Sequence, residues 1–313
     1  MSTLLTTIRK RRKARERADH RLQQAGQRAG LGCAFTISLL FIFLIFSFVL
    51  SYQSLTNDLP NLSEIESLLN PRTGSLLQPT RLYDRSGEHL IRVFAPENAT
   101  RRYLPLSPEN PQHLPDALAN ATLALADVEF WTHPGYSLEA LATPEFHPTL
   151  TQQLVADLLL WEEAPSLRRA LRERLLSAQL TKTYGRQQIL EWFLNSANYG
   201  NHAYGAEAAA QLYFEKSAAE LDTAESATLA AISQSPALNP LDAPVAAYQR
   251  RQETLYVMES LEMLEAEEAE AARRAPFNLP SLKETENPAP AFTRLILDQL
   301  DTRFPRERIE RGG

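Results

Sequence analysis

The stretch 125–135 holds three side chains that can transfer protons. They are Asp127, Glu129 and His133. Carboxylates and imidazoles this close together are the usual general acids and bases of enzymes. Phe130 and Trp131 lie among them and could form the wall of a sugar pocket, although such aromatics suit a hydrophobic core equally well. A Pro-Gly pair at 134–135 predicts a turn directly after this candidate site.

A basic N-terminus precedes a long apolar run. Residues 1–30 carry nine Lys or Arg and two acidic residues, within a chain of net charge −6. A basic N-terminus of this kind can bind nucleic acid. The next stretch, Leu31–Leu50, however, has twenty uncharged, mostly apolar residues, enough to span a bilayer. We therefore expect a cytoplasmic tail over 1–30, one transmembrane helix over 31–52, an extracytoplasmic main domain in the cell membrane and no nucleic-acid partner.

The rest of the chain predicts a mainly α-helical domain. The prolines and Gly74 of 53–79 indicate a juxtamembrane linker, and β-prone runs around a turn at 84–87 predict a small hairpin. Apolar spacing and capping residues predict helices over Pro115–Val128, Ser137–Leu141, Thr149–Leu160, 166–183, Gln187–Asn195, Ala206–Phe214, Asp222–Ser233, 244–274 and 291–301. The only cysteine, Cys33, lies in the apolar run, so the outer domain must fold without an internal disulfide.

Several ordered motifs resemble those of the peptidoglycan glycosyltransferases of family 51. The family pattern Glu-Asp-x-x-Phe-x-x-His-x-Gly lies over Ala126–Gly135, Gly-Gly-Ser-Thr-x-Thr-Gln-Gln over Phe146–Gln153, and Arg-Lys-x-x-Glu over Arg169–Glu173. The segments Ile189–Phe214 and Pro236–Pro240, with Arg250 and Arg251, resemble the closing motifs. The likeness covers about residues 80–300.

This resemblance implies a lysozyme-like domain over 80–275 with a C-terminal extension over 276–313. It implies lipid II or a nascent glycan strand as substrate, other cell-wall synthesis proteins as partners, and a divalent cation as an aid to diphosphate departure. No other cofactor and no protein metal site are expected. By position in the motifs, the expected catalytic residues are Asp127 and Glu173, and the expected substrate-binding residues are Phe130, His133, Thr149, Gln152, Gln153, Arg169, Arg172 and Asn195.

The chain departs from the family pattern in four places. The general base is replaced by Ala126, which cannot accept a proton, and the Gly-Gly-Ser of the second motif is Phe146-His147-Pro148. Two cationic positions are Ala156 and Ala170, and each loss weakens binding of a diphosphate. We therefore predict a family-51 fold with weak or no polymerase activity.

Other interpretations of these residues remain open. Glu129, one helical turn beyond Ala126, or His147 could replace the base, which would give an active polymerase. The domain could instead be a non-catalytic scaffold that binds lipid II or glycan. Arg169 and Glu173, four residues apart, could form only a surface ion pair.

Overall fold

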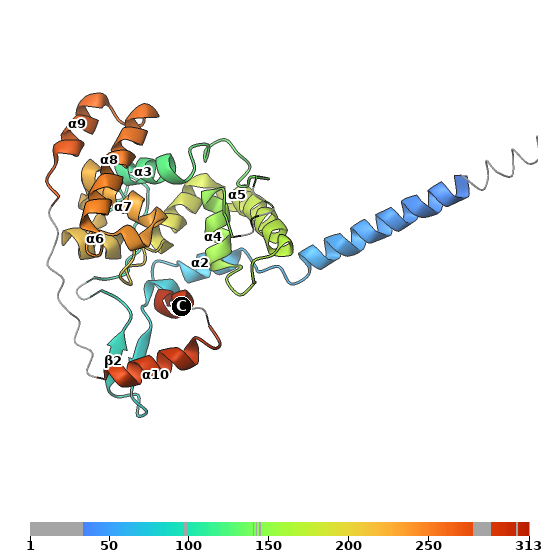
Figure 1. Cartoon of the computed structure of the whole chain (residues 1–313), viewed down its shortest axis with the longest axis horizontal. Coiled ribbons are helices and arrows are strands. Elements are labelled where there is room, and N and C mark those ends of the chain that lie inside the picture. The colour runs from blue at the N-terminus through green and yellow to red at the C-terminus, as the bar shows by residue number, and fades with distance from the viewer. Residues whose placement is uncertain are drawn as a thin grey trace, which may run out of the picture. The chain divides into compact units, whose positions relative to one another are not determined.

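The computed structural model describes residues 34–96, 99–139, 141, 143, 145–277, 289–304 and 306–312, in two compact units divided at Leu59/Pro60. In the first unit, the helix Ala34–Thr56 is long and apolar enough to cross a membrane, with a mean hydropathy of 2.5. The expected apolar helix is thus confirmed from Ala34 onwards (Figure 1). The basic tail 1–30 lies outside the described residues.

The second unit is mainly helical, as predicted. Its helices are α2 Ser63–Leu68, α3 Asp116–Ala126, α4 Leu150–Leu158, α5 Leu167–Ser196, α6 Ala206–Phe214, α7 Thr223–Gln234, α8 Pro244–Ser260, α9 Ala266–Arg274, α10 Pro290–Leu300 and α11 Arg306–Arg311, with 3-10 turns at Ser75–Leu77, Ala218–Glu220 and Pro236–Leu238. Its strands are β1 Arg81–Tyr83 and β2 Leu90–Val93.

One core cluster joins α3, α7, α8 and α9 through small side chains. Its alanines include Ala121, Ala124, Ala227 and Ala230, all at most 5% exposed, and Leu255 and Met258 fill the remaining space. Because alanine projects only a methyl group, α3 and α7 can pack closely along their length. Beside this cluster, α4 packs on α5, and these two helices carry most of the motif residues.

The helix α5 joins two of the predicted helices. It is interrupted at Gly185, whose φ of 77° and ψ of 165° are not helical. Only glycine adopts such angles readily, so the chain changes direction here without leaving the domain. At the other end of the domain, the region 244–274 is two helices, α8 and α9, because Glu262 takes a left-handed φ of 57° between them.

The predicted hairpin is confirmed. β1 and β2 are antiparallel, with Arg81 opposite Val93, and an irregularity at Leu82/Tyr83. The turn between them includes Gly87 with a φ of 76°. Phe94, which follows β2, packs against Leu297 of α10, and Figure 1 shows α10 beside this hairpin.

Two segments differ from the sequence expectations. The interval expected to be a linker contains α2 and a 3-10 turn, and buries Ile65, Leu69 and Leu76 at 0%, 1% and 4% exposure. Proline and glycine indicated a spacer there, but the apolar residues between them pack into the domain. The described part of Ser137–Leu141 is not helical, because its backbone carbonyls bond to α5 instead, as described below.

Arg101 ties the C-terminal segment to the domain. Its guanidinium donates to the carbonyl oxygens of Phe94 at 3.0 Å, Glu310 at 2.9 Å and Arg311. The pKa of Arg101 is lowered to about 10, mainly by burial; Tyr204 opposes this shift and the charge of Arg311 adds to it. The extension predicted from position 276 is therefore docked on the domain through α11.

Gly135 offers a stability test of the turn that follows the first motif. It has a φ of 93°, and an added Cβ would overlap Thr181 Oγ1 and lie 2.8 Å from the Ser177 carbonyl oxygen. We expect Gly135→Ala to lower the free energy of unfolding by about 3 kcal/mol, from backbone strain and overpacking together. Gly87→Ala is the control, since its φ is also positive but no atom lies within 4 Å, so about 1 kcal/mol is expected. Equal losses in urea titrations would contradict this account.

Candidate functional site

The first motif lies at the end of α3. The helix stops at Ala126, and Asp127 leaves helical geometry with a φ of −166°. The buried Asp127 carboxylate accepts a hydrogen bond at 3.0 Å from the N–H of Leu150, which is the first residue of α4. This bond holds the end of α3 against the start of α4, as expected for a carboxylate near a helix N-terminus.

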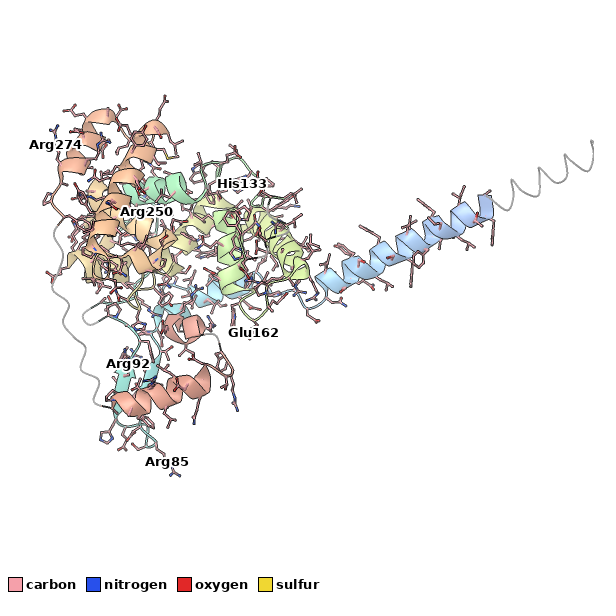
Figure 2. All side chains as sticks on the ribbon, in the orientation of Figure 1. Arg85, Arg92, His133, Glu162, Arg250 and Arg274 are labelled. Carbon is pink, nitrogen blue, oxygen red and sulfur yellow. The ribbon has the colours of Figure 1, made fainter. Side chains whose placement is uncertain are left out.

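His133 completes the same network. Its Nε2 lies 2.9 Å from both Asp127 oxygens, and its Nδ1 accepts from the Gly135 N–H at 2.9 Å. Because Nδ1 is an acceptor, the network assigns the ring proton to Nε2, which donates to Asp127. Both ring nitrogens are thus used inside the protein. Figure 2 labels His133 in the loop that follows α3.

Arg186 clamps this turn and was not among the predicted site residues. Its Nε donates to the Phe130 carbonyl at 2.8 Å, and its Nη2 donates to the His133 carbonyl. Phe130 is buried and meets Trp131 edge to face, with ring centroids 5.1 Å apart. Arg186 follows the kink at Gly185, and no sequence pattern links it to the first motif.

The second motif forms the N-terminus of α4. Thr149 caps the helix by accepting from the Gln152 N–H, and its hydroxyl donates to the Gly135 carbonyl at 3.0 Å. Gln152, fully buried, accepts from the Ser137 N–H at 2.8 Å and donates to Glu173 Oε1 at 2.7 Å. These two predicted substrate-binding residues therefore join three segments of the domain, while Gln153 is half-buried on the same helix.

Glu173 is the most deeply buried carboxylate of the predicted site, with 1% of its side chain exposed. His147 Nδ1 lies 2.8 Å from its Oε2, Gln152 donates to its Oε1, and Arg174 Nη1 lies 4.0 Å away. A buried carboxylate is tolerated only when such partners compensate for its lost hydration. The partner His147 occupies a position where the family pattern has glycine.

Arg174 holds the loop between the first two motifs on α5. Its Nε and Nη2 donate to the Ser137 and Glu139 carbonyl oxygens at 2.8 and 2.7 Å, and its Nη1 donates to the Ala170 carbonyl at 2.9 Å. Arg174 was also missing from the predicted site, because it follows the third motif directly and its sequence context resembles an exposed helix face. Only the fold shows that this side chain is buried.

The remaining predicted residues bond to the protein framework. Arg169 donates to the Leu160 carbonyl at 3.3 Å, and both it and Glu173 are buried, so the alternative of a surface ion pair between them is wrong. Arg172 Nε lies 2.9 Å from Glu163 Oε1. Asn195 accepts from the Leu104 N–H and donates to the Leu104 carbonyl, at 2.9 and 2.8 Å. Their assignment to substrate stays a prediction.

The structure defines the surroundings of Ala126, the position predicted to have lost the base. Ala126 is half-buried at the last turn of α3, whereas Glu129 is exposed in the turn beyond it. The expectation that Glu129 shares a helix face with Ala126 is wrong, because the helix ends first and the Glu129 carbonyl accepts from the His133 N–H. The two positions without a cation, Ala156 and Ala170, are each 1% exposed.

The donor set does not fit a protein-held divalent cation. Among the described residues, no group of three or more His, Cys, Asp or Glu side chains is arranged to hold a metal ion. The two carboxylates of the motifs, Asp127 and Glu173, already accept from protein donors at 2.7 to 3.0 Å. We therefore do not assign a cation to these residues.

This mainly helical domain, with its motif residues gathered at the N-terminus of α4 and along α5, is of the class expected for peptidoglycan glycosyltransferases. A family model described as Transglycosylase matches residues 89–259, more than half of the chain. The chain therefore belongs to the transglycosylase family.

Curated relatives are similar over this domain. Penicillin-binding protein 1A of Rickettsia prowazekii is 35% identical over 200 residues, 59% of this chain and 24% of that protein. Penicillin-binding protein 2D of Bacillus subtilis is 31% identical over 252 residues, 75% of this chain and 35% of that protein. A crystal structure of penicillin-binding protein 1A from Haemophilus influenzae, at 22% identity, matches 72% of this chain and 24% of its own with a TM-score of 0.39. The chain thus spans about a quarter to a third of these relatives.

The His147–Glu173 contact can be measured by a double-mutant cycle. Removing the imidazole leaves a buried carboxylate with one partner fewer, so His147→Ala should destabilise the protein by about 1.5–3 kcal/mol. In a Glu173→Gln background the same change should cost about 1 kcal/mol less, since no charge is left unpaired. Additive losses in chemical denaturation would show that the two side chains do not interact. His89→Ala, which removes an exposed partner of Asp84, is a matched control expected to change stability little.

Proposed function

We propose that this protein is a membrane-anchored transglycosylase-family member that binds lipid II or nascent glycan and has weak or no polymerase activity. The observation that carries the proposal is the state of the two catalytic positions. One is Ala126, and the other, Glu173, is 1% exposed with both oxygens bonded to protein groups. Neither position presents a free carboxylate to a sugar.

The energetic cost supports this proposal. A positioned general base contributes roughly 10²–10⁴-fold to a proton transfer, and a methyl group contributes nothing. To contact a donor, Glu173 would have to exchange its bonds to His147 and Gln152, each worth about 1.5–3 kcal/mol for an ionised acceptor. The retained Glu173 is thus better suited to holding α4, α5 and the loop together than to turnover.

The diphosphate side is weakened in the same way. Ala156 and Ala170 are buried methyl groups where the family pattern has cations. Pro148 has no N–H to offer a phosphate, and the exposed Phe146 adds bulk. Affinity for the lipid-linked substrate would then rest on the sugar and lipid, which favours a role as a binding or scaffolding protein for other cell-wall synthesis proteins.

An active polymerase with a substitute base is the second candidate function, and one observation favours it. His147 bonds Glu173 through Nδ1, so its Nε2 remains the nitrogen able to accept a proton, on a side chain that is 19% exposed. The acceptor hydroxyl would give its proton to Nε2 as its oxygen bonds the anomeric carbon, and the bond to the diphosphate would break. Glu129 is a weaker substitute because it lies beyond the end of α3.

Restoring the base tests the proposed function. Ala126→Glu should raise the rate of lipid II polymerisation by about 10²-fold, the low end for a general base, since the other three positions stay changed. The measurement is conversion of labelled lipid II to glycan chains by the detergent-purified full chain. Ala126→Gln, of similar size but unable to take a proton, should leave the rate unchanged.

Two outcomes would decide between the candidates. Wild-type turnover equal to that of an authentic polymerase, and lost in His147→Ala, would replace the proposal by the active enzyme. Absence of lipid II binding by the wild type, measured in the same detergent, would remove both. Specific binding without turnover is the expected result.

The proposed membrane orientation can be tested by cysteine labelling. In a Cys33→Ser background, a membrane-impermeant maleimide should label Ser86→Cys, in the hairpin turn, in intact cells. Ser2→Cys should be labelled only after the cells are lysed, because the basic tail is expected in the cytoplasm. The reverse pattern would overturn the orientation.

A further inference from the structure

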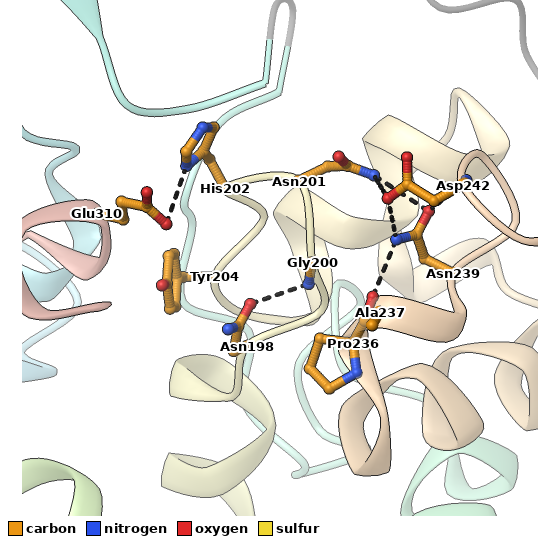
Figure 3. A pocket seen from close by; sticks show the side chains of 10 residues that line it. All are labelled: Asn198, Gly200, Asn201, His202, Tyr204, Pro236, Ala237, Asn239, Asp242 and Glu310. Carbon is orange, nitrogen blue, oxygen red and sulfur yellow. Dashed lines mark hydrogen bonds and ion pairs between the residues drawn. The ribbon is translucent and has the colours of Figure 1, made fainter. Parts of the chain in front are cut away.

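A polar pocket lies apart from the residues of the first three motifs. It has a volume of about 330 Å³, close to the lower end for ligand pockets. Its described lining residues are Asn198, Gly200, Asn201, His202, Tyr204, Pro236, Ala237, Asn239, Asp242 and Glu310. They come from the loop after α5, the turn after α7, and α11 (Figure 3).

The loop after α5 is held in an unusual conformation. Gly200, Asn201 and His202 are consecutive and all have positive φ, of 78°, 48° and 63°. Left-handed geometry costs a non-glycine residue about 1 kcal/mol or more. The loop is maintained because Asn201 donates to Asn239 Oδ1 at 3.1 Å and the His202 carbonyl accepts from Arg101 at 3.5 Å. The pocket wall is thus built before any ligand arrives.

One buried polar atom in this wall pairs with a carboxylate but makes no hydrogen bond. His202 Nδ1 is buried and has no hydrogen bond among the described residues. The nearest acidic group, Glu310 Oε2, is 3.6 Å away, too far for a direct hydrogen bond. A buried nitrogen without a hydrogen bond favours a ligand that supplies one, and a hydroxyl can donate to an acceptor and accept from a donor at the same time. A hydroxyl group would complete this part of the wall.

The chemistry of the lining indicates which ligand carries that hydroxyl. Part of the lining is already bonded within the wall: Asp242 Oδ2 accepts from Asn239 at 2.6 Å and from Asn201 at 3.3 Å, and Asn198 Oδ1 accepts from the Gly200 N–H at 2.9 Å. The Glu310 carboxylate adds acceptor oxygens, the Asn198 amide nitrogen is a donor, and the Asn201 amide oxygen is an acceptor. None of the described lining residues is Lys or Arg, so an anionic group such as a diphosphate is not suited to the pocket. A neutral ligand with several hydroxyl and amide groups is suited to this pocket. We infer that this pocket is a second saccharide site, which binds one N-acetylated sugar unit of a glycan.

The choice of a glycan rests on the proposed function, but the site does not use the residues of the first three motifs. Most of its lining lies in the segments 189–214 and 236–240, which resemble the closing motifs. A strand bound at this pocket would be held without any catalytic group. It would add affinity for glycan in a protein whose diphosphate contacts are weakened, by linking two modest binding events on one strand.

Filling the pocket tests the inference. The probe is the β-1,4-linked trimer of N-acetylglucosamine, titrated into the detergent-purified full chain by calorimetry. Ala237→Trp places an indole at the pocket without removing any of its hydrogen bonds, and should weaken binding by about tenfold or more. Leu238→Trp, at the next residue and outside the lining, is the matched control and should bind as the wild type does.

Polar variants examine the proposed contacts. Glu310→Gln should weaken trimer binding by about tenfold, as a charged acceptor is lost. His202→Asn, chosen because Asn tolerates positive φ, should also weaken binding. Thermal unfolding of each variant within a few degrees of the wild type would show that the fold persists.

Measuring trimer binding and lipid II binding separately distinguishes a failure of the saccharide site from a failure of the proposed function. No trimer binding by the wild type, or equal binding by Ala237→Trp, overturns the saccharide site. Lipid II binding measured in the same preparation is expected to survive in Ala237→Trp, so the proposed function stands even when the pocket fails. Absence of lipid II binding by the wild type, with trimer binding kept, would overturn the proposed function and leave the saccharide site in place.

Discussion

The need to compensate a buried carboxylate organises the candidate site. Glu173 has 1% of its side chain exposed, and an ionised group so far from water must have protein donors. They come from Gln152 on α4 and from His147 just before that helix. Since Gln152 also accepts from the Ser137 N–H, the same contact fixes the loop between the first two motifs. The packing of α4, α5 and this loop therefore depends on the bonds made by the Glu173 carboxylate.

The other motif residues follow the same logic. Asp127 and His133 join α3 to α4, and Asn195 pairs with the backbone of Leu104 like a neighbouring strand. Residue types that mark a catalytic site in the family are here bonded to the framework. A domain can therefore keep most of its motif residues for stability while it carries Ala126 where the family pattern has glutamate. This separation of fold from chemistry is the basis of the proposed function.

The C-terminal segment is part of the domain as described. Arg101 holds the carbonyls of α11, Arg311 Nη1 donates to the Asp157 carbonyl at 3.0 Å, and Glu310 borders the polar pocket. Asp157 thus has a structural partner at a position next to a missing cation. Because the chain spans only about a quarter to a third of its relatives, the activities of those longer proteins do not transfer to it directly, and its own contacts carry the proposed function.

The sequence by itself determined the apolar helix, the mainly helical class, the hairpin and the family, because each depends on local periodicity or on ordered motifs. It also determined that position 126 is alanine where the family pattern has glutamate, which is a matter of residue identity. The tertiary structure decided where side chains point. It placed Glu129 beyond the end of α3, paired His147 with Glu173, and brought Arg174 and Arg186 onto loops distant in sequence. It also folded the expected linker onto the core and built the pocket from three separate segments. Some of these contacts join residues more than a hundred positions apart. A local sequence pattern does not show which distant group pairs with a buried donor or acceptor.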